Sequence, residues 1–206
     1  MWAQNLVGFE DNMSMMCKGC HSREGAADKK PIENHSHPVN VGLERIGGRS
    51  TLPLFDENGS VSSNDTEVSG KVVCATCHDV HQWNMKDANI ASTEEGSGQD
   101  SFLRIAAAPS PDLCSNCHQT KKYVIGTDHD MRVTAPEATN IKAEDIQKTG
   151  VCGQCHMIHN APERAAIWAR PLSGKGDKIA QLCTSCHNES GPAKKKLTGK
   201  LTVNSM

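Results

Sequence analysis

One pattern, Cys-x-x-Cys-His, governs this chain, because it occurs five times and uses all ten cysteines. It is the attachment motif of c-type haem: the two thiols form thioethers with the haem vinyl groups, and the histidine ligates the iron from the proximal side. The sequence therefore predicts five haem c cofactors. The thioether cysteines are Cys17, Cys20, Cys74, Cys77, Cys114, Cys117, Cys152, Cys155, Cys183 and Cys186, and the proximal histidines are His21, His78, His118, His156 and His187.

Two other chemistries use Cys-x-x-Cys pairs, namely zinc sites and redox-active dithiols. Neither requires a histidine directly after the second cysteine, whereas all five copies carry one. Haem attachment is therefore the preferred interpretation. Because no cysteine is left over, a disulfide framework is not expected.

The apolar content is low for a chain of 206 residues: 36% are hydrophobic, 3% are aromatic and the mean hydropathy is −0.53. Such a chain has little from which to build a hydrophobic core. Five large apolar cofactors would supply that core, so the haem-free protein is expected to be largely unfolded. We predict a mostly irregular fold with short α-helices and one small β-hairpin, wrapped around haem.

The hairpin would enter through Leu52–Phe55, turn at Asn58-Gly59 and return through Val61 and Lys71–Val73. Three helical segments are also expected. One starts at Pro111-Asp112, one covers Ala143–Lys148 and ends at Gly150, and one starts at Asn160 as its cap.

A two-haem unit occurs twice. His159 follows its motif at the same interval as His81, and Ile167–Arg170 takes the place of Ser101–Arg104. We therefore predict a single pentahaem unit with three parts. These are 1–69 with the first haem and the hairpin, 70–130 with one two-haem unit, and 131–206 with the second two-haem unit and the tail.

Five histidines lie outside the motifs, which is the number of distal ligands that five six-coordinate irons need. They are His35, His37, His81, His129 and His159. The repeat suggests a pairing as a hypothesis. His81 would serve the haem of His118, His159 that of His187, His129 that of His156, His37 that of His78, and His35 that of His21.

The series Gly70–His81, Phe102–Arg104 and Leu113–His118 resembles the doubled-CXXCH multihaem cytochromes, and residues 150–187 resemble them nearly as well. The resemblance implies closely spaced bis-histidine haems, stacked within pairs and T-shaped between them, that transfer electrons. Similar proteins include the extracellular cytochrome filaments, or nanowires, of metal-reducing bacteria, whose subunits join haem chains end to end.

The formal net charge is −2, and haem propionates would make the loaded protein more acidic. No long basic patch indicates nucleic acid; the short run Lys194–Lys196 is interpreted as a solvated tail. The sequence contains no run of 18 apolar residues, so no transmembrane segment is predicted. Bacterial haem attachment takes place outside the cytoplasmic membrane, so we expect an exported protein, extracellular or periplasmic. Its partners would be redox proteins, an extracellular acceptor or further copies of itself.

Three classes of function remain. An electron conduit is preferred, because two imidazoles fill the iron coordination sphere and leave no site for substrate. We therefore do not expect an enzyme. A multihaem reductase would need one five-coordinate iron, and His35 is the spare histidine that we would first expect not to ligate an iron. Nitrite reductases, moreover, typically carry Cys-x-x-Cys-Lys at the active haem, whereas all five motifs here end in histidine. Haem storage is the third and weakest alternative.

Overall fold

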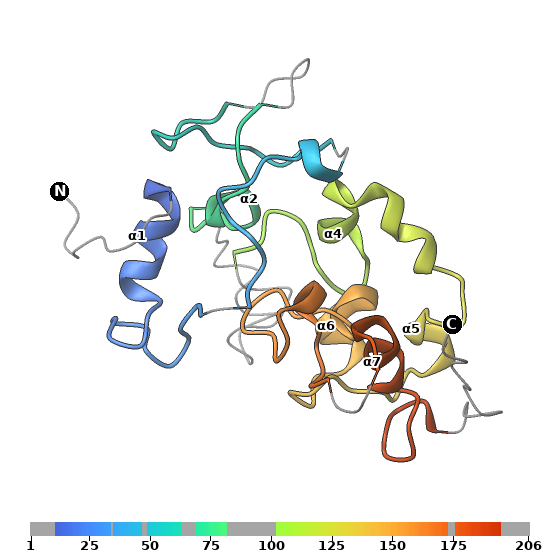
Figure 1. Cartoon of the computed structure of the whole chain (residues 1–206). Coiled ribbons are helices and arrows are strands. Elements are labelled where there is room, and N and C mark those ends of the chain that lie inside the picture. The colour runs from blue at the N-terminus through green and yellow to red at the C-terminus, as the bar shows by residue number, and fades with distance from the viewer. Residues whose placement is uncertain are drawn as a thin grey trace.

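The structure is a computed structural model that describes residues 11–33, 35–46, 49–62, 69–81, 102–172 and 176–194. Short helices are joined by irregular segments, as the sequence predicts (Figure 1). The loop 88–100 and nearly all of the tail lie outside the described residues. The helices among the described residues are α1 (Asn12–Cys20), η1 (Glu44–Ile46), α2 (Cys74–Cys77), α4 (Asp112–Cys117), η2 (Gln119–Val124), α5 (Met131–Thr134), α6 (Ile146–Gly153), η3 (Ala165–Ile167) and α7 (Lys178–Thr184).

All five Cys-x-x-Cys-His motifs adopt the same helical turn. In each, the backbone N–H of the histidine donates to the carbonyl of the first cysteine four residues earlier. Residues four apart share one face of a helix, so the first thiol and the imidazole point to the same side. The five N···O distances are 2.9 Å for His21, 3.0 Å for His78, 2.9 Å for His118, 3.0 Å for His156 and 2.9 Å for His187.

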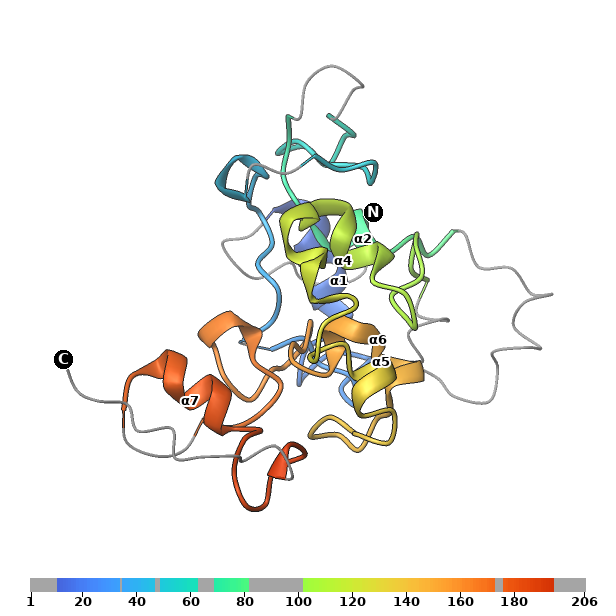
Figure 2. The ribbon, with the colours of Figure 1, turned by 90° about the vertical axis from the view of Figure 1, so that its right-hand side faces the viewer.

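Aspartate side chains begin three of these helices. Asp11 accepts from the N–H of Ser14 in α1, and Asp177 accepts from the N–H of Ala180 in α7. Asp145 caps α6. Each carboxylate satisfies N–H groups that have no partner within the helix. The α1 and α2 turns pack against each other, and so do α5 and α6. In Figure 1, α5, α6 and α7 lie on the side of the ribbon away from α1, and in Figure 2 they lie below α1, α2 and α4.

The apolar core of the described residues is small. One cluster contains Leu43, Leu54 and Val72, with Cys117 of the third motif packed against it. The other consists of Met157, Ala161 and Ala169, directly after the fourth motif. Both clusters touch or adjoin motif segments, as expected if the cofactors supply most of the core.

The predicted hairpin is present as isolated bridges and not as continuous strands. Phe55 pairs with both Val61 and Lys71, and Val41 pairs with Val72. The turn closes at Gly59, which has a φ of 81° that favours glycine. No helix among the described residues is long and apolar enough to cross a membrane.

The internal repeat is confirmed in three dimensions. After the second motif, the N–H of Asp79 donates to Phe102 O at 2.7 Å; after the fourth, the N–H of Met157 donates to Ile167 O at 2.9 Å. Phe102 and Ile167 both have positive φ, 55° and 45°. These shared bonds and angles make the two residues equivalent.

This equivalence corrects the sequence alignment of the repeat by one residue. The alignment placed Arg104 opposite Arg170, but the structure places it opposite Ala169. The N–H of Arg104 donates to Cys77 O at 2.9 Å, and that of Ala169 to Cys155 O at 2.8 Å. Ser101 lies outside the described residues.

Two helix predictions are also corrected. Asn160 begins no helix, because its φ is 57° and its side chain bonds to another segment; only the short η3 follows, at Ala165. The helix expected at Ala143 starts at Ile146, and Gly150 interrupts it with a φ of 65° instead of ending it. The helix start at Pro111-Asp112 is confirmed.

The first and last motifs are followed by the same loop. Ala27 N–H donates to Cys20 O at 3.0 Å, and Ala193 N–H donates to Cys186 O at 3.2 Å. A glycine stands five residues after the second cysteine in both. A Cβ on Gly25 or on Gly191 would lie 2.1 Å from that same cysteine carbonyl. Only glycine therefore fits.

Replacing Gly25 or Gly191 by alanine is expected to lower the free energy of unfolding by about 1–3 kcal/mol, because the backbone oxygen cannot move away without opening the loop. Guanidinium unfolding of the holo-protein measures this. The matched controls Glu24→Ala and Glu189→Ala change exposed neighbours, and each should stay within about 0.5 kcal/mol. Equal losses in glycine variants and controls would contradict the steric explanation.

Candidate functional site

Consecutive motifs contact each other through their cysteines. A hydrogen bond joins the thiols of Cys17 and Cys74 and, together with burial, raises the pKa of Cys17. A bond of the same kind joins Cys114 and Cys152 and raises the pKa of Cys114. The first motif thus adjoins the second, and the third adjoins the fourth.

The other two contacts, between the second and third motifs and between the fourth and fifth, are made by the second cysteine of each motif. Burial raises the pKa of Cys77 to about 11, with a further contribution from nearby Cys117. Burial and then Cys186 raise the pKa of Cys155 to about 11. The motifs therefore form one series in sequence order, in which first cysteines and second cysteines meet alternately.

Three of the five spare histidines face a motif histidine. The ring centroids of His78 and His159 lie 6.1 Å apart with an interplanar angle of 25°. The other two pairs are His37 with His118 at 6.2 Å and 74°, and His129 with His187 at 6.2 Å and 90°.

These separations fit two imidazoles on opposite sides of one metal ion. With about 2 Å for each metal–nitrogen bond and roughly 1.1 Å from nitrogen to ring centre, the centroids would lie roughly 6.2 Å apart. All three facing pairs have this spacing.

Backbone carbonyls set the tautomer of several of these rings. Nδ1 of His21 lies 3.0 Å from Lys30 O, Nδ1 of His156 lies 2.8 Å from Ala166 O, and Nδ1 of His37 lies 3.0 Å from Pro38 O. A carbonyl only accepts, so Nδ1 carries the proton and Nε2 keeps its lone pair. Histidines that ligate metals are usually oriented in this way.

Burial favours the neutral form of three of the facing rings, those of His37, His118 and His159. Burial lowers the pKa of His37, and burial lowers that of His118, with the neighbouring His156 adding to the effect. Burial, followed by nearby His78, lowers the pKa of His159 to about 4. A neutral imidazole is the form that binds a metal.

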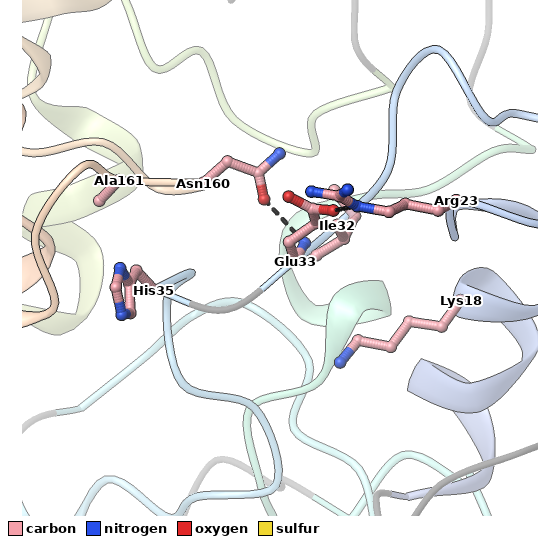
Figure 3. A pocket seen from close by; sticks show the side chains of 7 residues that line it. All are labelled: Lys18, Arg23, Ile32, Glu33, His35, Asn160 and Ala161. Atoms are coloured by element: carbon pink, nitrogen blue, oxygen red, sulfur yellow. Dashed lines mark hydrogen bonds and ion pairs between the residues drawn. The ribbon is translucent and has the colours of Figure 1, made fainter.

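His35 opens onto a cavity beside the first motif. The cavity has a volume of about 620 Å³, and His35 and Lys18, an inner residue of that motif, line opposite sides of it (Figure 3). Arg23 and Glu33 form an ion pair on its wall. His35 is thus placed near the first motif, as the hypothesis expected, but no ring contact joins it to His21 in the described structure.

His156 faces no spare histidine among the described residues. The ring of Trp168 packs edge-on against it with centroids 5.6 Å apart, and the Trp168 indole N–H donates to Ser185 Oγ at 2.9 Å. His81 is exposed, and its backbone N–H donates to Asp79 Oδ1 at 3.0 Å.

The facing rings depart from the pairing hypothesis at three histidines. His37 faces His118 and not His78, His159 faces His78 and not His187, and His129 faces His187 and not His156. The hypothesis kept ligands within each repeat, whereas His159 reaches from the second repeat to the first. The sequence analysis also missed Asn160 as a bridging residue.

Residues 146–192 match the family model for the doubled CXXCH motif, which covers less than a quarter of the chain. A search of curated proteins and a search of solved structures found no match. The matched region runs from α6 through the last two motifs. It supports a multihaem c-type cytochrome with covalently bound haem and a role in electron transfer.

Proposed function

We propose that this chain is a pentahaem c-type cytochrome that carries electrons along five closely spaced bis-histidine haems. The observation that carries the proposal is the recurrence of facing imidazoles at the spacing of two ligands on one metal ion. When bound, each haem iron would alternate between ferric and ferrous states and so hold one electron at a time.

The polypeptide would contribute ligands, order and shielding. Two cysteines and a proximal histidine would hold each haem, and a distal histidine would close its remaining axial site. The cysteine contacts between successive motifs support an arrangement in which neighbouring haem edges lie close together in sequence order.

The distal ligands are assigned from the facing rings and by elimination. His159, His37 and His129 would serve the second, third and fifth haems. His35 would serve the first, across the cavity beside Lys18. His81 would then serve the fourth, on His156.

An exported protein, extracellular or periplasmic, suits this chemistry, with a redox protein or an extracellular acceptor as partner. Assembly of copies into a conductive filament is the finer form of the proposal. Electron microscopy of the purified holo-protein decides between a filament and a monomeric shuttle.

A reductase is the second candidate, and one observation favours it. His156 has the orientation of an iron ligand, but Trp168 and no spare histidine packs against it in the described structure. If His81 does not reach this haem, its iron would have a free axial site for a small substrate.

Electron paramagnetic resonance of the oxidised holo-protein, integrated against total haem, is expected to show only low-spin iron. Near-parallel axial imidazoles split the iron d orbitals strongly and give a rhombic signal; near-perpendicular ones give a signal of large g anisotropy. The His78–His159 pair should give the rhombic type, and the pairs at 74° and 90° the large-anisotropy type. One equivalent of high-spin iron would contradict full bis-histidine ligation and favour the reductase.

A further inference from the structure

Two segments far apart in sequence are joined along a seam that carries three of the proposed distal ligands. Residues 31–37 contain His35 and His37, and residues 158–161 contain His159. The N–H of His37 donates to Ile158 O at 2.7 Å, and the N–H of Ala161 donates to His35 O at 3.1 Å. The backbones next to the ligands are thus bonded directly to each other.

Asn160 lies at the centre of this seam. Its side-chain Oδ1 accepts from the N–H of Glu33 at 2.7 Å, and its Nδ2 donates to Pro31 O at 2.7 Å; Figure 3 shows the first of these bonds. Its backbone N–H donates to Ser36 Oγ at 3.1 Å. One residue therefore contacts the opposite segment at three points.

The backbone conformation selects asparagine at this position. Asn160 has a φ of 57°, in the left-handed region that glycine and asparagine tolerate best. Glycine would keep the turn but lose both amide bonds. Alanine would lose the bonds and also strain the turn.

We propose that Asn160 is a positioning residue that fixes the distal ligands of two different haems at once. His159, directly before it, faces His78 of the second motif. His37, on the segment that Asn160 binds, faces His118 of the third motif. Loosening the seam therefore releases both imidazoles together. This inference rests on the bis-histidine ligation proposed above.

The test compares Asn160→Gly, Asn160→Asp and the control Asn140→Ala in holo-protein. Asn140 is buried and makes three side-chain bonds, to Lys142 and Glu144, but among the described residues it bonds to no distal-ligand segment. Carbon monoxide binds ferrous haem only where the sixth ligand yields. We expect the wild type and Asn140→Ala to bind equally little carbon monoxide at the haems of the second and third motifs.

Asn160→Gly should bind about two further equivalents of carbon monoxide per chain, one at each iron assigned to His37 and His159, and a third where His35 is released with them. The rhombic signal and one large-anisotropy signal should weaken together in the oxidised variant. Asn160→Asp keeps the acceptor for Glu33 N–H and loses the donor to Pro31 O, so its effect should be intermediate.

A change at one haem only, or an equal change in Asn140→Ala, would overturn the inference. So would unchanged ligation in Asn160→Gly. If wild type itself binds carbon monoxide at the second and third haems, the proposed function fails instead, which separates the two outcomes.

Discussion

Replacing His159 by alanine is expected to convert about one iron per chain from low-spin to high-spin and to remove the rhombic resonance signal. The reason is that the His159 ring lies opposite His78 at the spacing of two axial ligands, and this is the facing pair with near-parallel planes. Low-temperature resonance spectra of the oxidised variant measure both effects. Added imidazole should restore the low-spin state, because it replaces the missing ligand without repairing the chain.

His81→Ala is the matched control, because His81 holds the same position in the other copy of the repeat. It should also release one iron, that of His156, yet leave intact the rhombic signal that the His78–His159 pair gives. If His159→Ala instead removes a large-anisotropy signal, then His159 serves the haem of His187. The pairing inferred from the repeat would then be right and the pairing of facing rings wrong.

Preventing haem attachment should abolish cooperative folding. With all ten cysteines replaced by alanine, we expect little helical circular dichroism, no cooperative thermal transition and rapid exchange of backbone amides. The described apolar clusters contain only three buried side chains each, too few to offset the conformational entropy of a chain this long. Hydrogen exchange followed by mass spectrometry measures the loss segment by segment.

Removing a single attachment site provides the control for this prediction. Cys183→Ala with Cys186→Ala affects only the last motif, so protection should fall around α7 while α1 and α2 remain ordered. A haem-free chain that unfolds cooperatively, with native-like amide protection, would show that the polypeptide alone specifies the fold.

The motifs and the irregular, helix-poor fold were predictable from sequence because their signals are local. A Cys-x-x-Cys-His turn requires nothing beyond five consecutive residues, and all five turns carry the same backbone bond. The glycine after the first and last motifs has an equally local cause, a clash at 2.1 Å, but the role of Gly25 and Gly191 was not predicted from the sequence.

The pairing of ring with ring was not predictable, because it depends on tertiary structure. His37 and His159 lie far apart in the sequence, and hydrogen bonds between residues 31–37 and 158–161 bring their segments together. The one-residue error in the repeat has a similar origin. Positive φ at Phe102 and Ile167 shifts the backbone register, and a positive φ is not expected from sequence at a phenylalanine or an isoleucine.

Under the proposed ligation, the positions of His37 and His159 along the chain would set the order in which two haems gain their distal ligands. A chain delivered from its N-terminus presents His37 long before the third motif, so that haem can acquire both imidazoles as soon as it is attached. The second haem is in the opposite position, since His159 emerges long after His78. Under the proposed ligation, the second haem would spend part of maturation with one axial ligand, and its other face would be accessible to a chaperone or to a small external ligand during that interval.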